Sequence, residues 1–261
     1  MIIDGHSHVV LPVEKHISLM DEASIDKTIL FSTPIHPEKA ADMAHLKSEM
    51  SVLNEIITGK RNAAEAGLQS MEELGSVINQ YPTRFVGFGR VPVRLSYDDT
   101  ASYIEKNVKN AGYVGLGEFT LGSGQVNLLD VIFKASVSSG NLPLWIHAFN
   151  PLTLNDIQDI AALAIEYPSV PVIIGHMGGS SWLETIELVK QIPNLFMDLS
   201  AYFSALVLKM AILELPYKCI FGVDLPYGDL LLARQGIERV CTDKYVRSRV
   251  LGENIREILK I

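Results

Sequence analysis

Ile3-Asp4-Gly5-His6-Ser7-His8 opens the chain with an apolar start and two histidines that are one residue apart. Alternate side chains of a β-strand point to the same face. His6 and His8 are therefore predicted to lie side by side, as a pair of metal ligands must. Similar short apolar runs recur along the chain, and several of them also end in a polar residue. This recurrence favours a fold that is built from repeated strands.

Apolar runs rich in β-branched residues alternate with longer stretches of helical period. Eight runs are predicted to be strands, at residues 2–9, 27–33, 84–91, 113–119, 142–148, 170–176, 195–201 and 219–225. Helices are predicted at residues 62–80, 97–110, 128–139, 153–166, 181–191, 229–240 and 243–260. Strands that are apolar on both faces and alternate with helices indicate a parallel sheet.

Eight strand and helix units in 261 residues fit a closed (β/α)8 barrel, the TIM barrel, as a single domain over residues 1–261. A doubly wound open sheet is the alternative. The barrel is favoured because polar candidates end several strands, and strand ends converge on one mouth in a barrel but spread along an edge in an open sheet. A long connection at residues 34–61 is interpreted as an insertion, either a functional lid or a partly helical decoration.

Four of the later runs end in a residue that can bind a metal ion. Glu118 ends the fourth predicted strand, His147 the fifth, His176 the sixth and Asp224 the eighth. In a barrel these side chains meet the His-x-His pair of the first strand at the mouth. Imidazoles with a carboxylate are the ligands of catalytic divalent ions, so the sequence predicts a metal centre.

Some of the acidic residues have roles beyond metal binding. Asp224 is predicted to be a ligand and also the base that orients and deprotonates a water whose pKa the metal lowers. Glu118 is interpreted as a bridge to a second ion, a ligand of a single ion, a proton shuttle, or the partner of a structural arginine. Asp198 is predicted to hydrogen-bond a ligating histidine, and Asp4 to accept either an imidazole N–H or a backbone group.

Three residues are candidates for binding substrate. Arg90 ends the third predicted strand and is suited to bidentate binding of a carboxylate, with a salt bridge at the rim as the alternative. His36 follows the second strand and Tyr227 the eighth, which places both near the mouth, although packing alone would also account for Tyr227. The remaining histidines, His16 and His45, are predicted to lie on the surface.

Composition excludes some partners. Asp and Glu outnumber Lys and Arg by 30 to 22, and this net charge of -8 argues against non-specific nucleic-acid binding. No apolar run approaches the roughly 20 residues of a membrane span, and no signal peptide is recognised. The two cysteines, Cys219 and Cys241, do not indicate a disulfide framework, so a cytoplasmic location is expected. The expected partner is a small-molecule substrate, and a homodimer is the default assembly.

Taken together, His6-x-His8, the strand-end histidines and Gly222-Val223-Asp224-Leu225-Pro226 resemble the amidohydrolase superfamily, in particular the amidohydrolase-related branch that includes decarboxylases and lactonases. The resemblance runs from the first to the eighth predicted strand. It implies a metal centre whose ligands are His6, His8, Glu118, His147, His176 and Asp224. Glu118 stands where many relatives carry a carboxylated lysine and others a glutamate, which leaves one ion or two.

The resemblance implies a metal-dependent hydrolase of a small amide, lactone or ester, with Zn²⁺ as the favoured ion and Mn²⁺ or Co²⁺ as alternatives. Asp224, His176 and Glu118 are the expected catalytic residues. The alternative is non-oxidative decarboxylation of a small aromatic or unsaturated acid. In decarboxylases of this group the strand-6 histidine can act as an acid or base, so His176 has either role. A metal-binding barrel without activity is the third reading.

Overall fold

Short parallel strands form the centre of the molecule. The computed structural model describes residues 1–57 and 63–261, so positions 58–61 of the predicted connection and Asn62 of the predicted helix lie outside the described residues. The strands are β1 (Ile3–His8), β2 (Lys27–Phe31), β3 (Phe85–Gly87), β4 (Leu116–Phe119), β5 (Leu144–Ile146), β6 (Val172–Ile174), β7 (Leu195–Asp198) and β8 (Cys219–Ile220). They pair in sequence order, β1-β2-β3 in one sheet and β4 to β8 in another.

Two isolated bridges join these sheets into a ring. Gly89 pairs with Leu116 between β3 and β4, and Ser7 pairs with Leu225 between β1 and the segment that follows β8. The N–H of Gly5 also donates to the carbonyl of Phe221 at 2.7 Å. Closure through both junctions confirms the predicted (β/α)8 barrel over the doubly wound open sheet.

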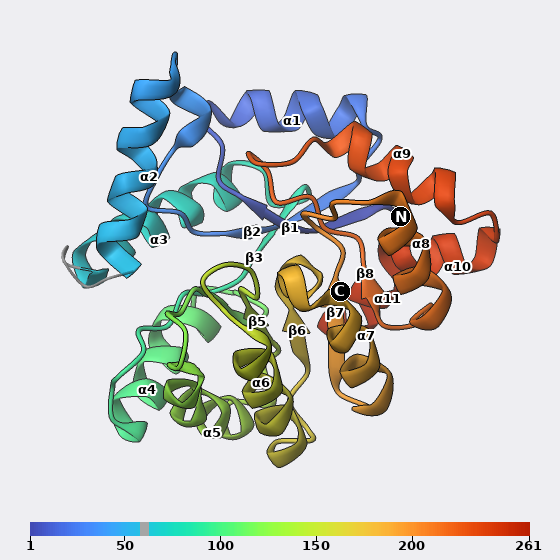
Figure 1. The fold of residues 1–261 in the computed structure, drawn as a ribbon. Helices are drawn as coiled ribbons and strands as arrows, with labels where there is room; N and C mark the ends of the chain where they lie inside the picture. The colour runs from blue at the N-terminus through green and yellow to red at the C-terminus, as the bar shows by residue number, and fades with distance from the viewer. Residues whose placement is uncertain (58–62) are drawn as a thin grey trace.

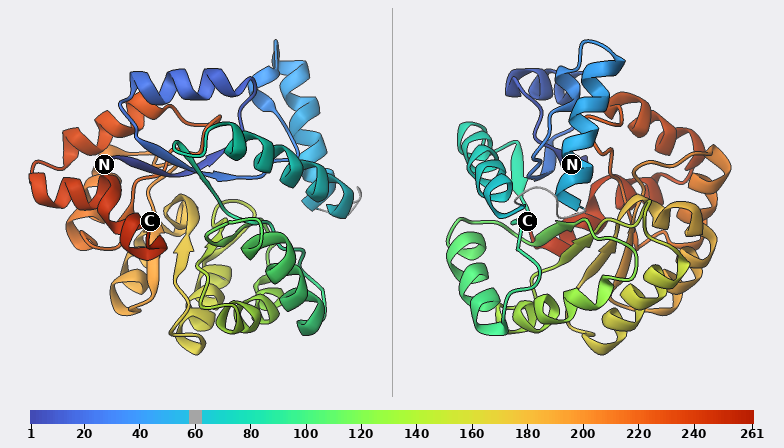
Figure 2. Two further views of the ribbon diagram at one scale, coloured as in Figure 1. Left: turned by 180° about the vertical axis from the view of Figure 1, so that it is seen from behind. Right: turned by 60° about the vertical axis from the view of Figure 1, so that its left-hand side comes forward.

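The helices lie around the strands (Figures 1 and 2). They are α1 (Val13–Glu22), α2 (Met43–Ile57), α3 (Ala63–Gln80), α4 (Tyr97–Ile104), α5 (Asp130–Ser138), α6 (Leu154–Glu166), α7 (Trp182–Gln191), α8 (Ala205–Glu214), α9 (Leu230–Val240), α10 (Lys244–Ser248) and α11 (Asn254–Leu259). Shorter turns are η1 (Pro37–Lys39), η2 (Glu105–Lys109), η3 (Val126–Leu129), η4 (Gly175–Ser181) and η5 (Arg249–Glu253). Within the described residues no helix is both long and apolar enough to cross a bilayer.

Several predicted elements differ in extent or number. The strands are shorter than predicted, because their polar ends leave the sheet and turn into the loops of the mouth. Two helices, α1 and α8, were not predicted, whereas α2 and η1 lie in the connection that follows β2 and agree with the alternative of a partly helical decoration. The predicted C-terminal helix 243–260 is divided into α10, η5 and α11.

The barrel interior supports the mouth from below. Phe31, Phe88 and Trp145 are fully buried, and their rings contact one another with centroids 5.0 to 5.8 Å apart. The ring of His6 packs on two of them, 5.0 Å from Phe31 and 5.3 Å from Trp145. Aromatic packing of this kind fixes the orientation of the imidazole before any ligand binds.

Candidate metal centre

Six ionisable side chains meet at the carboxyl ends of the strands. They come from β1, β4, the segments after β5, β6 and β8, and comprise His6, His8, Glu118, His147, His176 and Asp224. These are the residues that the sequence proposes as ligands, and the fold brings all of them together. Their roles as ligands remain a prediction.

The carboxylate of Glu118 lies at the middle of this group. Its Oε2 is 3.6 Å from the Nε2 atoms of both His6 and His8. Its Oε1 is 3.2 Å from Nδ1 of His147 and 3.2 Å from Nε2 of His176. The Nε2 atom of His8 lies 3.3 Å from Asp224 Oδ1, and that of His6 lies 4.0 Å from the same oxygen. The side chains thus form two overlapping sets of ligands that share His6, one with Glu118 and His176 and the other with His8 and Asp224.

The donor atoms of these sets fit a metal ion. Nε2 of His6 and Oδ1 of Asp224 are buried, and neither has a hydrogen-bond partner among the described residues. Buried polar atoms without a partner are rare and costly. These two atoms are 4.0 Å apart, and Nε2 of His8 is 3.3 Å from the same Asp224 oxygen, so one divalent cation would satisfy both of them. The mixture of imidazole and carboxylate suits Zn²⁺, Mn²⁺ or Co²⁺.

Asp198 orients two of the histidines from behind. Its Oδ2 accepts a hydrogen bond from Nδ1 of His6 at 2.7 Å, which leaves the Nε2 lone pair of His6 free for a cation. The same oxygen accepts from the Ser200 hydroxyl at 2.5 Å, and Ser200 Oγ lies 2.9 Å from Nδ1 of His176. The sequence prediction that Asp198 bonds one of these histidines is confirmed. Gly222 leaves room for it, because a Cβ there would lie 2.1 Å from Asp198 Oδ1.

Asp4 supports the site through the backbone rather than through an imidazole. Its Oδ1 accepts the N–H groups of His6 at 3.1 Å and Val223 at 3.0 Å, and its Oδ2 accepts the Ser7 hydroxyl at 2.5 Å. Ser7 Oγ in turn accepts the N–H of Leu225. These bonds hold the segment that carries Asp224 against β1. Burial raises the pKa of Asp4 to about 7.

The backbone is unusual where two of the candidate ligands are attached. Asp224 has φ 61 and His176 has φ 51, a left-handed conformation that residues other than glycine seldom adopt. Such conformations gather at functional sites, where the surrounding structure enforces them. At Asp224 the enforcing contacts include its own N–H, which donates to the His6 carbonyl at 2.6 Å.

The carboxylates of the group attract positive charge to His6, whether a proton or a metal ion that takes its place. Burial lowers the pKa of His6, but the charges of Glu118 and Asp198 outweigh it and hold that pKa well above its usual value. Burial raises the pKa of Glu118, yet the charge of His6 and the contacts with His147 and His176 keep it well below its usual value. Glu118 is therefore an ionised carboxylate in a buried setting, the form that a cation binds.

The residues predicted to bind substrate lie in different places. Arg90 packs against Gly67 of α3, where an added Cβ would lie 3.5 Å from Nε of Arg90. Burial lowers the pKa of the guanidinium. No ion pair of Arg90 is present within the described part of the chain. His36 contacts Glu38 and Glu73 rather than the six central side chains. Tyr227 is half-exposed, and its hydroxyl lies 4.0 Å from the sulfur of Met50 in α2.

The two remaining histidines differ in their exposure to solvent. His45 is exposed, as predicted. The prediction for His16 is wrong, because this residue is buried on the inner face of α1, with its ring 5.1 Å from that of Phe85. A single histidine in a short helix gives no periodic signal of which face it occupies.

Ser200 and Glu38 were not identified from the sequence. Ser200 lies two residues after Asp198 and bonds both that carboxylate and His176. Glu38 lies two residues after His36 and bonds its ring. A spacing of two next to a candidate residue is the signal that would have identified each of them.

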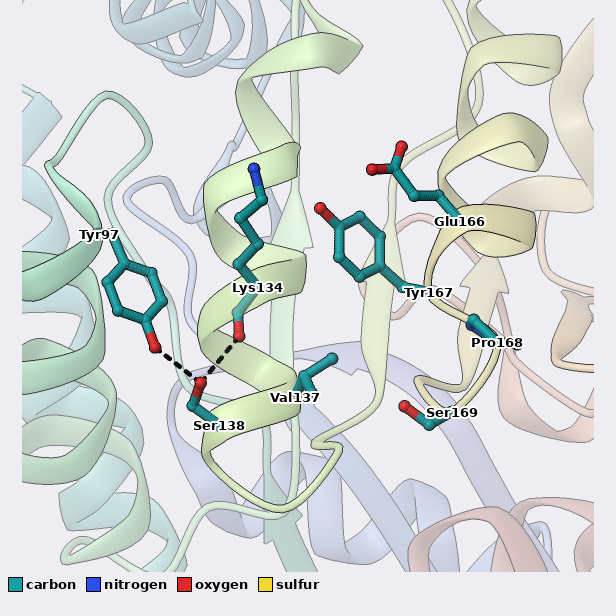
Figure 3. A pocket seen from close by; sticks show the side chains of 8 residues that line it. All are labelled: Tyr97, Lys134, Val137, Ser138, Glu166, Tyr167, Pro168 and Ser169. Carbon is teal, nitrogen blue, oxygen red and sulfur yellow. Dashed lines mark hydrogen bonds between the residues drawn. The ribbon is translucent and has the colours of Figure 1, made fainter.

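A groove on the outer surface is separate from this centre. Figure 3 shows a groove of about 570 Å³ among α4, α5 and α6, where Tyr97 bonds Ser138 and Lys134 faces Tyr167 and Glu166. None of the six central side chains lines it. The groove is a surface feature between helices of the outer layer.

Comparison with known proteins agrees with this geometry. A family model described as amidohydrolase matches residues 3–261. No curated protein matches the chain.

Solved structures share the fold at low sequence identity. The 2,6-dihydroxybenzoate decarboxylase from Rhizobium is 17% identical, with a TM-score of 0.70 over 99% of this chain and 98% of that one. A dihydroxybenzoic acid decarboxylase from Polaromonas sp. with bound manganese and 2-nitroresorcinol is 17% identical, with a TM-score of 0.67 over 99% and 96%. The 4-oxalomesaconate hydratase from Rhodopseudomonas palustris is 15% identical, with a TM-score of 0.70 over 100% and 96%.

Proposed function

The chain belongs to the amidohydrolase family, and we propose that it is a metal-dependent decarboxylase of a small aromatic or unsaturated carboxylic acid. The observation that carries this proposal is the pair of unsatisfied atoms, His6 Nε2 and Asp224 Oδ1, that converge with His8 beside three further ionisable groups. Two of the similar solved structures are decarboxylases, which supports placing this reaction ahead of the hydrolysis expected from the sequence.

We assign the two ligand sets to different steps of the reaction. A divalent ion held at the centre would act as a Lewis acid, orienting a substrate carboxylate for loss of CO2 or activating a water for hydrolysis. His6, His8 and Asp224 are assigned to hold that ion. His176, which contacts His147 at 3.0 Å and Glu118 at 3.2 Å, is assigned to proton transfer.

In decarboxylation the carbon–carbon bond to the carboxylate breaks, and its electron pair stays on the substrate carbon. A proton from His176 then replaces the lost CO2, and Glu118 with His147 returns a proton to the imidazole. Ser200 hydrogen-bonds Nδ1 of His176, so that Nε2 is the nitrogen that is assigned to give its proton to the substrate carbon.

Hydrolysis of a lactone, ester or amide is the second candidate. The observation that favours it is the central position of Glu118, whose two oxygens face different pairs of histidines. A carboxylate so placed is suited to bridge two ions, with His147 and His176 as ligands of the second. Two ions per chain would therefore favour hydrolysis, and the products formed separate the two candidates whichever number of ions is bound.

The test combines metal analysis with product analysis. Protein purified without chelator is analysed for Zn²⁺, Mn²⁺ and Co²⁺, then incubated with 2,6-dihydroxybenzoate and other hydroxybenzoates, and with a panel of lactones, esters and amides. We expect one ion per chain and release of CO2, both lost in the His6→Ala, His8→Ala double variant. An exposed-histidine variant, His45→Ala, is the control and should retain both.

Other results of the metal and product analysis would favour a different function. Two ions and hydrolytic products would favour the second candidate. Bound metal with no turnover in either panel would favour a binding protein without activity. No metal even after reconstitution would overturn the proposal.

Two further expectations accompany this function. The free cysteines Cys219 and Cys241 are both buried, which suits a reducing compartment, and we expect the enzyme to act in the cytoplasm. We also expect a homodimer, which sedimentation analysis would test.

A further inference from the structure

Helix α8 and the residues next to its ends present a stripe of apolar side chains to solvent. Phe203, Leu206, Met210, Leu213 and Tyr217 are each between 37% and 68% exposed. The spacings of four and three residues place Leu206, Met210 and Leu213 on one face of α8, while Phe203 comes just before the helix and Tyr217 just after it. Single exposed apolar residues are ordinary, whereas a row of five large ones indicates a surface that binds another molecule.

The opposite face of α8 already packs on the barrel. Val207, Leu208, Ala211 and Ile212 are buried there. A helix that is apolar on every side is one that is covered on every side. Because α8 belongs to the outer layer of the molecule (Figure 1), its outward face has no cover within the described part of the chain. The cover must come from another molecule.

The two ends of the stripe are held in place by neighbouring elements. The ring of Phe203 lies 6.4 Å from that of Trp182, the first residue of α7. At the other end the Arg249 guanidinium lies 5.4 Å from the centre of the Tyr217 ring, and Arg249 is itself paired with Glu257. Side chains that are ordered beforehand lose less entropy when a partner binds. The stripe is therefore preorganised for association.

The area of the stripe matches the apolar part of one side of a stable interface. Large side chains present roughly 150 to 250 Å² each when fully exposed, so the five residues at their exposed fractions present on the order of 500 Å². A stable interface takes about 800 Å² from each partner, of which roughly 60% is apolar. The stripe alone supplies about this apolar share, and the polar residues around it would supply the rim.

The order of residues along the stripe is nearly the same in both directions. An aromatic residue stands seven positions to each side of Met210, Phe203 before it and Tyr217 after it. A leucine stands four positions before Met210 and another three positions after it. A two-fold axis through Met210 would therefore lay Leu206 of one copy on the partner's Leu213. An interface between two identical copies requires such a self-complementary surface.

We infer that two copies of this chain associate through the α8 stripe, with Met210 at the two-fold axis. The symmetry of the stripe favours a second copy over an unrelated protein, which has no need of it. This inference goes beyond the proposed function and does not depend on the reaction, so a failure of either leaves the other standing.

The test measures the dissociation constant of the dimer by sedimentation velocity over a range of protein concentrations. We expect the wild type to be dimeric at micromolar concentration. Met210→Lys should raise the Kd by about 30-fold or more, because two ammonium groups meet at the axis where two thioethers packed. Met210→Leu, which keeps an apolar side chain of similar volume, should leave the Kd within a few-fold of the wild type. Ile165→Lys, the same change in charge at an exposed apolar residue of α6, is the matched control and should also leave it unchanged.

Cross-linking locates the axis independently of stability. Treatment of Met210→Cys with a short bismaleimide should give a covalent dimer, whereas Ile165→Cys should give none. The native Cys219 and Cys241 are buried and should not react. A monomeric wild type, or a dimer that Met210→Lys weakens no more than Ile165→Lys does, would overturn the inference. A larger assembly that Met210→Lys divides into smaller units would support it. Circular dichroism and Zn²⁺ content show that each variant keeps the barrel and the metal centre.

Discussion

At the scale of single residues, Asp198 couples the two ligand sets. One carboxylate oxygen accepts from His6, from Ser200 and from the N–H of His176 at 3.2 Å, and it has no exposure to solvent. An asparagine in this place has one acceptor fewer and presents N–H donors to groups that themselves donate. The orientation of both histidines then depends on an amide that cannot satisfy them together.

We therefore expect Asp198→Asn to lower metal affinity by about 10- to 100-fold, the usual effect of removing a carboxylate behind a ligating histidine. Competition between the protein and a chelator for Zn²⁺ measures this affinity without reference to turnover. Asp130→Asn, which changes a surface carboxylate paired with Lys134, is the matched control. Equal affinities in the three proteins would show that Asp198 does not tune the centre.

His16 gives the protein a dependence of stability on pH that is independent of the metal centre. Burial, together with the charge of Arg84, lowers its pKa to about 4, and its Nε2 has no partner among the described residues. The unfolded chain takes up this proton near pH 6.5, whereas the folded chain does so only near pH 4. The stability is therefore complete above pH 6.5 and is lost as pH falls towards 4.

By pH 5 this loss amounts to about 2 kcal/mol, from 1.36 kcal/mol for each pKa unit. Guanidinium unfolding at pH 7.5 and pH 5 measures it, and the same measurement on His16→Leu removes the contribution of all other groups. We expect the wild type to lose about 2 kcal/mol more than the variant between the two pH values. An identical loss in both proteins would mean that His16 is protonated without cost in the fold.

At the scale of elements, the parts that the sequence predicts are those in which a local pattern matches the tertiary environment. Each of the eight apolar runs contains a strand, because a strand that is buried on both faces must be apolar throughout. Their ends are less predictable. Residues such as His147 and His176 continue the apolar run in sequence, but they leave the sheet to reach the mouth, so the hydrogen-bonded strands stop at Ile146 and Ile174.

Helix α8 was not predicted, because its sequence has no pattern that distinguishes a buried face from an exposed one. Its sequence, ALVLKMAILE, is apolar on every side, and Leu206 and Leu213 are exposed while Leu208 and Ile212 are buried. A helix without a polar face has no period to detect. Five of the six candidate ligands were predictable because they lie at or near the end of an apolar run, and His6 because it is paired with His8 in the first run. Of the residues behind them, Asp198 was predicted but Ser200 was not, because the contact of Ser200 with His176 joins residues that are 24 positions apart.

At the scale of the whole molecule, the metal centre and the closure of the barrel depend on the same bonds. The last strand is only Cys219–Ile220, and the chain beyond it joins β1 through backbone bonds, among them Val223 N–H to the His6 carbonyl at 3.1 Å. Asp4 accepts from both of these segments. Its side chain thus closes the ring and fixes the loop that carries Asp224. Closure and metal binding are expected to fail together when this link is removed.

A comparison of Asp4→Ala with Asp4→Asn tests whether Asp4 joins barrel closure to metal binding. In Asp4→Ala the buried N–H of His6 and the Ser7 hydroxyl lose the oxygens that accept from them, and the N–H of Val223 keeps only the His6 carbonyl. We therefore expect a loss of about 3 kcal/mol in unfolding free energy together with lower metal content. Asp4→Asn keeps an oxygen for the two N–H groups, and its amide donates to the Ser7 oxygen, so that only the Ser7 O–H loses its acceptor. It should stay within about 1 kcal/mol of the wild type and retain its metal, since it no longer buries a carboxyl group. Guanidinium unfolding and metal analysis of both variants measure the contrast. If both substitutions were equally harmful, the charge of Asp4, and not its role as an acceptor at the closure, would be what the barrel requires.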